Sequence, residues 1–339
     1  MHGNRFRQDL SRRGFGAALA SLTAVGAAAD PLAQGPSTAP PTALDGALVA
    51  TGADDAGRIT VPVRVNGQGP FRFVVDTGAN RTVISSELAA ALALPAGGAA
   101  DIHGIVGVEP AQTALIDRLD VDAVSARAIR APMLSRDRLG AAGLLGVDVL
   151  RRHRVSFDFV HRQLRLRSAS LAPDRSTLYD DTSNSGRLIQ MSGAKVVVPA
   201  QYRFGQLIII GADVSGQRVT AFVDSGSQST VGNNALRRVA SVEGAGAPKA
   251  VRQMTPILSA TGQTAQGEVS RMPLLKIGGL AITGLATVFA DLHVFQLWDL
   301  MKQPSLLLGM DILSLFDGIE LNYAQRQVIF YLPLRARSS

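Results

Sequence analysis

The feature that most constrains this chain is a short motif that occurs twice. The first copy, RFVVDTGANRTVIS, covers residues 72–85, and the second, TAFVDSGSQSTVGN, covers residues 220–233. Asp76 and Asp224 hold the same place in the two copies, 148 positions apart, and each follows an apolar run and precedes a hydroxyl residue and a glycine. Two carboxylates at equivalent positions of a duplicated unit predict one shared site.

The sequence on both sides of the motif is also duplicated. Upstream, residues 58–78 and residues 206–226 alternate apolar and polar side chains around an Asn-Gly or a Ser-Gly turn, which is typical of a β-hairpin. Downstream, Leu-Leu-Gly occurs at 144–146 and again at 307–309, each time before a helical turn and a closing strand hairpin. The same order of elements in both halves predicts two similar lobes.

Helices are expected only as short pieces after each motif. One covers Glu87–Leu94 and begins at Ser85 or Ser86, and the other covers Ala235–Ala240 and begins at Asn233 or Asn234, because serine and asparagine are favoured caps. The fold class predicted is therefore mostly β, with two β-barrel lobes related by a pseudo-twofold axis and a few short helices.

The start of the chain is predicted to be a targeting signal rather than part of the fold. Ser-Arg-Arg-Gly-Phe at 11–15 precedes an alanine-rich apolar run, which resembles a twin-arginine export signal, with an ordinary secretory signal as the alternative. A bacterial periplasmic or secreted location follows from it. No other run reaches the ~18 apolar residues that a membrane span needs. The expected organisation is an export signal at 1–29, a Pro-rich linker at 30–44, an N-terminal lobe at 45–167, a polar inter-lobe linker at 168–187 and a C-terminal lobe at 188–334.

Composition narrows the function without naming it. The 339 residues contain no cysteine, which excludes disulfides and thiolate metal sites. Of the net charge of +7, the first 29 residues supply +3, and the scattered histidines lack metal-ligand spacing, so neither a metal nor another cofactor is expected. A solvated sheet face is favoured over nucleic-acid binding for the densest basic cluster, which consists of Arg151, Arg152, Arg154, Arg162, Arg165 and Arg167.

The duplicated motif suggests a particular chemistry. Two carboxyls about 3 Å apart share one proton, because ionising both is costly. The ionised member can take a proton from a water held between them, while the protonated member donates a hydrogen bond to a carbonyl under attack. Such a pair hydrolyses amides without a metal and without a covalent intermediate.

These motifs resemble the signature of the aspartic proteases, in which two apolar residues and a glycine support the catalytic loop. The resemblance rests on Asp-Thr-Gly-Ala at 76–79 and Asp-Ser-Gly-Ser at 224–227, each with its Leu-Leu-Gly downstream. Asp-Thr-Gly-Ala is closest to retroviral-type proteases and their bacterial relatives, whereas the two-lobed single chain resembles pepsin. The resemblance implies acid-protease-like lobes over about 290 residues, counted from 45 to 334.

The resemblance also implies roles for individual residues. Asp76 and Asp224 would form the catalytic pair, with Thr77, Gly78, Ala79, Ser225, Gly226 and Ser227 supporting their loops. Thr77 and Ser225 would grip the opposite lobe's loop through their hydroxyls, and the two glycines would let the loops approach. Since Ser227 can donate a hydrogen bond to Asp224 and Ala79 cannot do so for Asp76, Asp224 is hypothesised to be the more readily ionised member.

Two loops are candidates for flaps over a bound peptide, and ordinary exposed hairpins are the alternative. They are residues 101–108 and 259–267, whose glycines suit moving lids. Neither contains the tyrosine of pepsin-like flaps, and the apolar tip of the first is more like the retroviral type. The candidate substrate-binding residues are His103, Gly104, Ile105, Val106, Thr261 and Gly262.

The sequence thus predicts an aspartic endopeptidase acting on an extended peptide or protein substrate. The alternative is a non-catalytic periplasmic peptide-binding or assembly protein with the same fold. Because both halves lie in one chain, a monomer with an intramolecular pair is expected, with no nucleic-acid partner. Obligate dimerisation is unnecessary but stays open.

Overall fold

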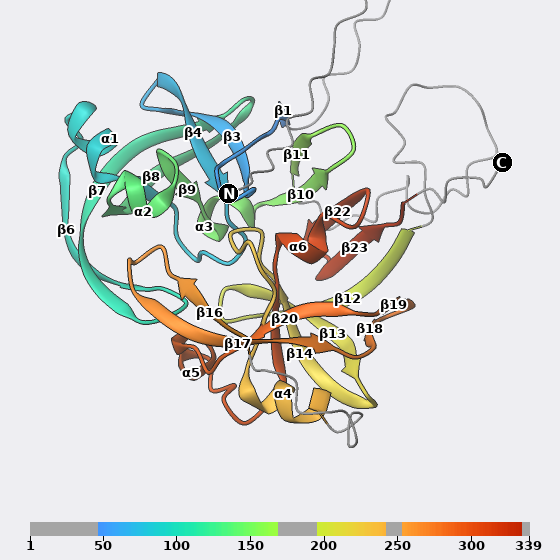
Figure 1. The fold of residues 1–339 in the computed structure, drawn as a ribbon. Helices are drawn as coiled ribbons and strands as arrows, with labels where there is room; N and C mark the ends of the chain where they lie inside the picture. Colours follow the sequence, from blue (N-terminus) through green and yellow to red (C-terminus); the bar gives the residue numbers. More distant parts are fainter. Residues whose placement is uncertain (1–46, 169–194, 242–252, 334–339) are drawn as a thin grey trace, which may run out of the picture. The chain divides into compact units, whose positions relative to one another are not determined.

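The computed structural model describes residues 47–168, 195–241 and 253–333, and most of them lie in β-strands (Figure 1). The mostly β fold with two lobes and short helices that the sequence predicts is confirmed. The described residues belong to one compact unit that spans Leu44–Ser339. The predicted export signal, the Pro-rich linker and nearly all of the predicted inter-lobe linker lie outside the described residues.

The N-terminal half forms an eight-stranded sheet that contains the first motif. The motif's aspartate follows the third strand of the sheet, and a further pairing between the second and seventh strands curls the sheet over its own core. In spatial order the strands are β2 (Gly52–Ala53), β3 (Ile59–Val65), β4 (Gln68–Val75), β9 (Gly143–Leu145), β5 (Val83–Ser85), β8 (Val124–Leu134), β7 (Val108–Val121) and β6 (Ala96–His103).

The remaining strands form a second sheet that contains the second motif. The main path runs β1 (Ala47–Ala50), β11 (Gln163–Ser168), β10 (His153–Asp158), β22 (Gly318–Asn322), β23 (Gln327–Tyr331), β12 (Lys195–Arg203), β13 (Gln206–Val214), β14 (Gln217–Val223), β21 (Ser305–Leu308), β15 (Val231–Gly232), β20 (Leu285–Phe289), β17 (Thr264–Met272) and β16 (Gln253–Leu258). β18 (Leu275–Ile277) pairs with β13 and with β19 (Leu280–Ile282).

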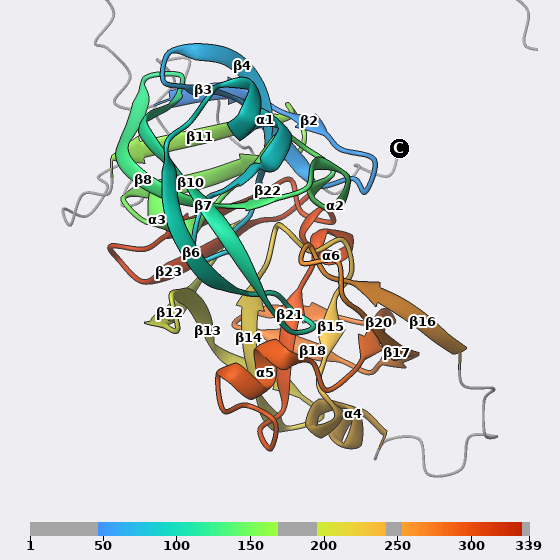
Figure 2. The same cartoon turned by 90° about the vertical axis from the view of Figure 1, so that its left-hand side faces the viewer.

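The two halves are joined by hydrogen bonding between their closing hairpins. β10 of the first half pairs antiparallel with β22 of the second, so that β10, β11, β22 and β23 form a continuous strip between the halves (Figure 1, Figure 2). Arg154 on β10 is 8% exposed and donates through Nε to Glu320 Oε1 on β22 at 3.0 Å. The prediction of a solvated face is wrong for Arg154, because a strand from the other half covers it.

The duplicated hairpins adopt the same turn. β3–β4 turns at Asn66 and Gly67, with φ of 49° and 79°, and β13–β14 turns at Ser215 and Gly216, with φ of 53° and 78°. Two successive positive φ values give the turn type that matches the twist of paired strands. Each hairpin delivers its second strand to the aspartate of one motif.

The helices are short and match the sequence prediction in place more closely than in length. Ser85 Oγ accepts from Leu88 N at 3.1 Å and starts α1, which ends at Ala91 instead of Leu94 because Ala93 has a φ of 47°. Asn233 Oδ1 accepts from Leu236 N at 2.8 Å at the start of α4. Within the described residues no helix is long and apolar enough to cross a membrane. The helices are α1 (Ser86–Ala91), α2 (Arg136–Leu139), α3 (Val147–Leu150), α4 (Asn234–Ser241), α5 (His293–Leu297) and α6 (Met310–Leu313).

Candidate active site

The two aspartates begin loops that are held at their bases in the same way. Asp76 N donates to Leu145 O at 3.0 Å, and Asp224 N donates to Leu308 O at 3.0 Å. The accepting leucines end β9 and β21, which run parallel to β4 and β14. The Leu-Leu-Gly repeats therefore support the loops that carry the aspartates.

The loops are linked to each other by reciprocal hydrogen bonds through buried hydroxyls. Thr77 Oγ1 donates to Val223 O at 2.8 Å and accepts from Ser225 N at 3.0 Å. Ser225 Oγ donates to Val75 O at 2.8 Å and accepts from Thr77 N at 3.1 Å. Thr77 and Ser225 are each 1% exposed. The structure thus brings together the two hydroxyl residues that the sequence singled out.

Replacing Thr77 with valine is expected to lower the free energy of unfolding by about 2–4 kcal/mol. Valine keeps the shape but leaves Val223 O and Ser225 N buried with one partner fewer, and each lost bond costs about 1–3 kcal/mol. The measurement is equilibrium denaturation of Thr77→Val beside Thr77→Ser, which keeps the hydroxyl. Equal stability of the two variants would contradict the role of these bonds.

The glycines of the two motifs place the carboxyls face to face. A methyl group added at Gly78 would overlap the carboxylate of Asp224, with Cγ at 2.6 Å and Oδ2 at 2.8 Å. A methyl group at Gly226 would likewise overlap Cγ and both oxygens of Asp76. Each carboxyl therefore lies directly against the glycine of the opposite loop, and only glycine leaves room for it.

Burial raises the pKa of both carboxyls. Desolvation is the largest cause for Asp76, whose anion is favoured by bonds of 2.9 Å from the N–H groups of Gly78 and Ala79 to Oδ1. Desolvation, followed by the negative charge of Asp76, raises the pKa of Asp224 to about 7. Asp224 is 6% exposed, whereas Asp76 is partly exposed. Burial and the neighbouring charge of Asp76 thus both favour the protonated form of Asp224.

The hypothesis that Ser227 makes Asp224 the more readily ionised carboxyl is wrong. Ser227 Oγ donates to Ser229 O at 2.8 Å, so its hydroxyl turns away from Asp224. The backbone N–H groups of Gly226 and Ser227 do lower the pKa of Asp224, but burial and the charge of Asp76 outweigh them. The asymmetry between Ala79 and Ser227 does not decide which carboxyl ionises.

A second pair of aspartates holds the ends of the loops that carry Asp76 and Asp224, and sequence reasoning missed this pair. Asp148 Oδ1 accepts from Thr82 N at 2.9 Å and from Thr82 Oγ1 at 2.7 Å. Asp311 accepts from Thr230 N at 2.9 Å and from Thr230 Oγ1 at 2.7 Å. The signal was present, because both threonines and both aspartates hold equivalent places in the duplicated sequence.

The two candidate flaps are β-hairpins whose tips meet. β6–β7 turns at 104–107, and β16–β17 turns at 259–263. A methyl group at Gly104 would overlap the hydroxyls of Ser259 and Thr261, and Gln263 Nε2 donates to Val108 O at 2.9 Å. The tips of the two hairpins are therefore in contact. Two independent exposed hairpins would not show such contacts.

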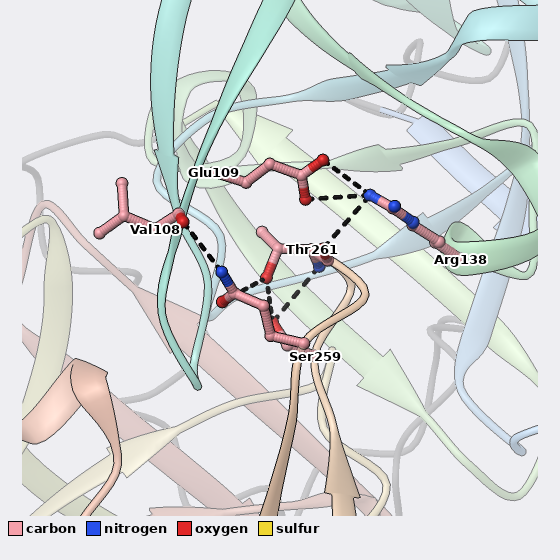
Figure 3. A network of polar contacts seen from close by, with 6 residues as sticks. Val108, Glu109, Arg138, Ser259 and Thr261 are labelled. Carbon is pink, nitrogen blue, oxygen red and sulfur yellow. Dashed lines mark hydrogen bonds and ion pairs between the residues drawn. The ribbon is translucent and has the colours of Figure 1, made fainter.

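An arginine from α2 ties the two hairpins together at their sides. Arg138 Nη1 donates to both carboxylate oxygens of Glu109 on β7, at 2.8 and 2.9 Å, and to Thr261 O at 3.3 Å (Figure 3). Gly262 has a φ of 79°, and a methyl group added to it would overlap the Arg138 guanidinium, with Nε at 2.7 Å and Cζ at 2.8 Å. Glu109 and Arg138 come from the first half and Thr261 from the second, so the guanidinium bridges the lobes.

The tip of the first hairpin lies against the other lobe and encloses a small cavity beside Asp224. Ile105 and Val106 pack against the apolar cluster of the other lobe around Phe222 and Trp298, and Val294 N donates to Ile105 O at 3.3 Å. A cavity of about 20 Å³ remains beneath, lined by Gly78, Ile105, Gln206, Phe222, Val223, Asp224, Val294, Trp298 and Leu307. That volume is room for about one water molecule.

Of the six candidate substrate-binding residues, only Ile105 lines the cavity beside Asp224, and His103 lies against α5. It does not line the cavity beside Asp224; its ring stacks on His293 of α5, with centroids 5.4 Å apart and Nδ1 and Nε2 3.1 Å apart. Conversely, sequence reasoning missed Gln206, whose Nε2 donates to Gly78 O at 3.0 Å, and Trp298. Trp298 is the only tryptophan of the chain, which was the one available signal.

No group of three or more side chains in the described ranges could hold a metal ion.

Replacing Ile105 with alanine is expected to loosen the first hairpin. The side chain contributes about 1 kcal/mol of partly buried apolar contact with the other lobe, so local opening should become about 5-fold more frequent. Hydrogen exchange at residues 102–107 measures this, with Val160→Ala, at a side chain 59% exposed, as the control. Unchanged exchange in Ile105→Ala would show that the tip does not hold the hairpin closed.

Both lobes match models of aspartyl protease families. Residues 61–152 match a family described as gag-polyprotein putative aspartyl protease, and residues 210–312 match a family described as aspartyl protease. The first match contains Asp76 and the second contains Asp224. No curated protein matched the chain. Two aspartyl protease families thus match two successive regions of the chain, which is consistent with a retropepsin-like aspartic protease of two lobes.

Proposed function

We propose that this chain is an aspartic endopeptidase that hydrolyses peptide bonds with a water activated by Asp76 and Asp224. The observation that carries the proposal is the facing of the two carboxyls, each against the glycine of the opposite loop. Their raised pKa values and the small cavity beside Asp224 support it. A merely structural pair of aspartates has no need of such burial.

The two carboxyls take different roles. Asp76 is the base, because it is the more exposed of the two carboxyls and two backbone N–H groups stabilise its anion through Oδ1. Its Oδ2 accepts no hydrogen bond from the described residues and is available to a water. Asp224 is the acid, because burial and the neighbouring charge favour its protonated form.

The reaction then balances without any other group. As the water attacks the scissile carbonyl carbon, its proton passes to Asp76 and the proton of Asp224 passes to the carbonyl oxygen. The tetrahedral diol collapses when Asp76 returns its proton to the amide nitrogen and Asp224 recovers a proton from a hydroxyl of the diol. The carbon–nitrogen bond breaks, and both carboxyls regain their starting states.

Substrate entry requires the hairpins to separate. A cavity of about 20 Å³ cannot hold a peptide, so the tips around Ile105 and Thr261 have to move apart before an extended chain reaches the aspartates. On closure, Ile105, Phe222 and Trp298 provide an apolar environment for the side chains beside the scissile bond. The sequence at 1–29 supports the further proposal that this activity is exported.

The test is incubation of the full chain with a diverse peptide library between about pH 4 and 8, a range that extends on both sides of the pKa of about 7 of Asp224. Mass spectrometry of the products identifies cleaved bonds. Cleavage at internal bonds of extended peptides is expected. Peptide binding without cleavage at any pH would refute the proposal and favour a binding protein of the same fold.

A further inference from the structure

A basic groove lies on the N-terminal lobe, outside the catalytic cavity. It has a volume of about 560 Å³ and is walled by the first part of β8 (residues 125–130), by α3 and the residues after it, and by the β12–β13 turn of the other lobe. Its charged lining consists of Arg81, Arg127, Arg130, Arg151 and Arg152, with a single carboxylate, Asp148. With His153 neutral the lining carries a net charge of +4.

Most of this positive charge has no partner among the residues that the structure describes. Arg81, Arg127, Arg151 and Arg152 are exposed, and within the described residues none of them forms a hydrogen bond or an ion pair. Several other arginines do pair with carboxylates, namely Arg58, Arg118, Arg138, Arg154 and Arg237. Gathering unpaired guanidiniums in one concavity is unfavourable unless an anion is brought to them.

The one carboxylate in the groove is already occupied. Asp148 Oδ1 accepts from Thr82 N, Thr82 Oγ1 and Val149 N, at 2.7 to 3.0 Å. Burial lowers the pKa of His153, so that this ring adds no charge at neutral pH. The free recognition chemistry of the groove is therefore that of guanidinium groups, which bind carboxylates in a bidentate manner.

The groove begins where the catalytic cavity ends. Gly78 and Gln206 line the cavity, and the adjacent residues Asn80 and Gly205 line the groove. Gln206 Nε2 donates both to Gly78 O at 3.0 Å and to Asn80 Oδ1 at 2.9 Å. These two hydrogen bonds form the wall between the cavity and the groove. A chain leaving the cavity past this wall would enter the groove.

We propose that the groove binds an acidic segment of the polypeptide substrate, adjoining the segment that is cleaved. The proposal rests on the proposed function for its link to cleavage. Continuity with the cavity favours a polypeptide over a lipid surface, which would not reach into a concavity between lobes. Tyr202 is the one aromatic residue of the lining, whereas single-stranded nucleic acid needs several stacking platforms.

Binding is tested apart from cleavage, in the full chain carrying Asp76→Asn so that no product forms. Fluorescence anisotropy compares a labelled Asp/Gly peptide with an Asn/Gly peptide of the same length. The acidic peptide is expected to bind at least about 10-fold more tightly, and the difference should shrink as salt rises from about 50 to 300 mM. Adding Arg127→Gln and Arg152→Gln should remove about 10-fold of the affinity, whereas Arg218→Gln, an exposed arginine outside the groove, should remove none.

Three results would overturn the inference. These are equal affinity for the two peptides, an acidic preference that survives Arg127→Gln with Arg152→Gln, and tighter binding of a single-stranded oligonucleotide or an anionic vesicle at the same arginines. With the catalytic aspartates intact, the two arginine changes should lower kcat/KM about 10-fold for a peptide that carries an acidic segment, whereas Arg218→Gln should not. If the unmodified chain cleaves no peptide but the binding of the acidic peptide still depends on the two arginines, the proposed function is refuted and the binding groove is supported.

Discussion

Replacing Asp76 or Asp224 with asparagine is expected to lower kcat at least about 10³-fold, with little change in KM. Asparagine keeps the size of the side chain but can neither take a proton from water nor give one to a carbonyl. Because the two carboxyls act as one unit, the double replacement should be no worse than either single one. The measurement is the initial rate on a peptide that the unmodified chain cleaves.

Stability separates this chemical loss from a folding defect. Since the pKa of Asp224 is raised from 3.8 to about 7 in the folded protein, the folded state holds its proton more tightly than the unfolded chain does. The unmodified protein should therefore lose stability, on the order of a few kcal/mol, as the pH rises from about 4 to about 7. Asp224→Asn should lack much of this loss and unfold at a temperature at least as high at pH 7.

The control is Asp117→Asn, at an exposed aspartate on β7 for which no ion pair is described. It should change neither kcat nor the pH dependence of unfolding. A single asparagine variant at position 76 or 224 that still cleaves at more than about a tenth of the normal rate would show that the two carboxyls do not share the reaction.

Local sequence predicted the parts of the fold that depend on a few neighbouring residues. The hairpin turns at Asn66 and Ser215 and the caps at Ser85 and Asn233 follow from turn and capping preferences. Duplication then supplied one long-range fact, that Asp76 and Asp224 lie opposite each other. The duplication alone was enough to predict that the two motifs meet.

The remaining features depend on pairings between distant segments. Arg154 is buried because β10 pairs with β22, which lies 166 positions away at Glu320. The hydroxyl of Ser227 turns to Ser229 because the loop's backbone, rather than its composition, decides which acceptor is near. Likewise, the cover over the cavity comes from Ile105 meeting α5 of the other lobe, which no local pattern records.

Replacing Gly226 with alanine is expected to lower kcat at least about 10²-fold and to destabilise the protein by about 1–3 kcal/mol. The added methyl group would overlap Cγ and both oxygens of Asp76, so the carboxyl has to move away from Asp224 or the two loops have to separate. Gly78→Ala should act in the same way on Asp224. Rates and thermal unfolding measure both effects.

Gly279→Ala is the matched control, because a methyl group there meets no atom within 4 Å and its backbone carries no positive φ. It should be neutral or slightly stabilising, since alanine restricts the unfolded chain. The backbone of Gly226 likewise needs no positive φ, so any loss in Gly226→Ala reports the closeness of the Asp76 carboxyl alone. Full activity in that variant would mean that the carboxyls lie farther apart than one shared proton allows, and the proposed mechanism would fail with it.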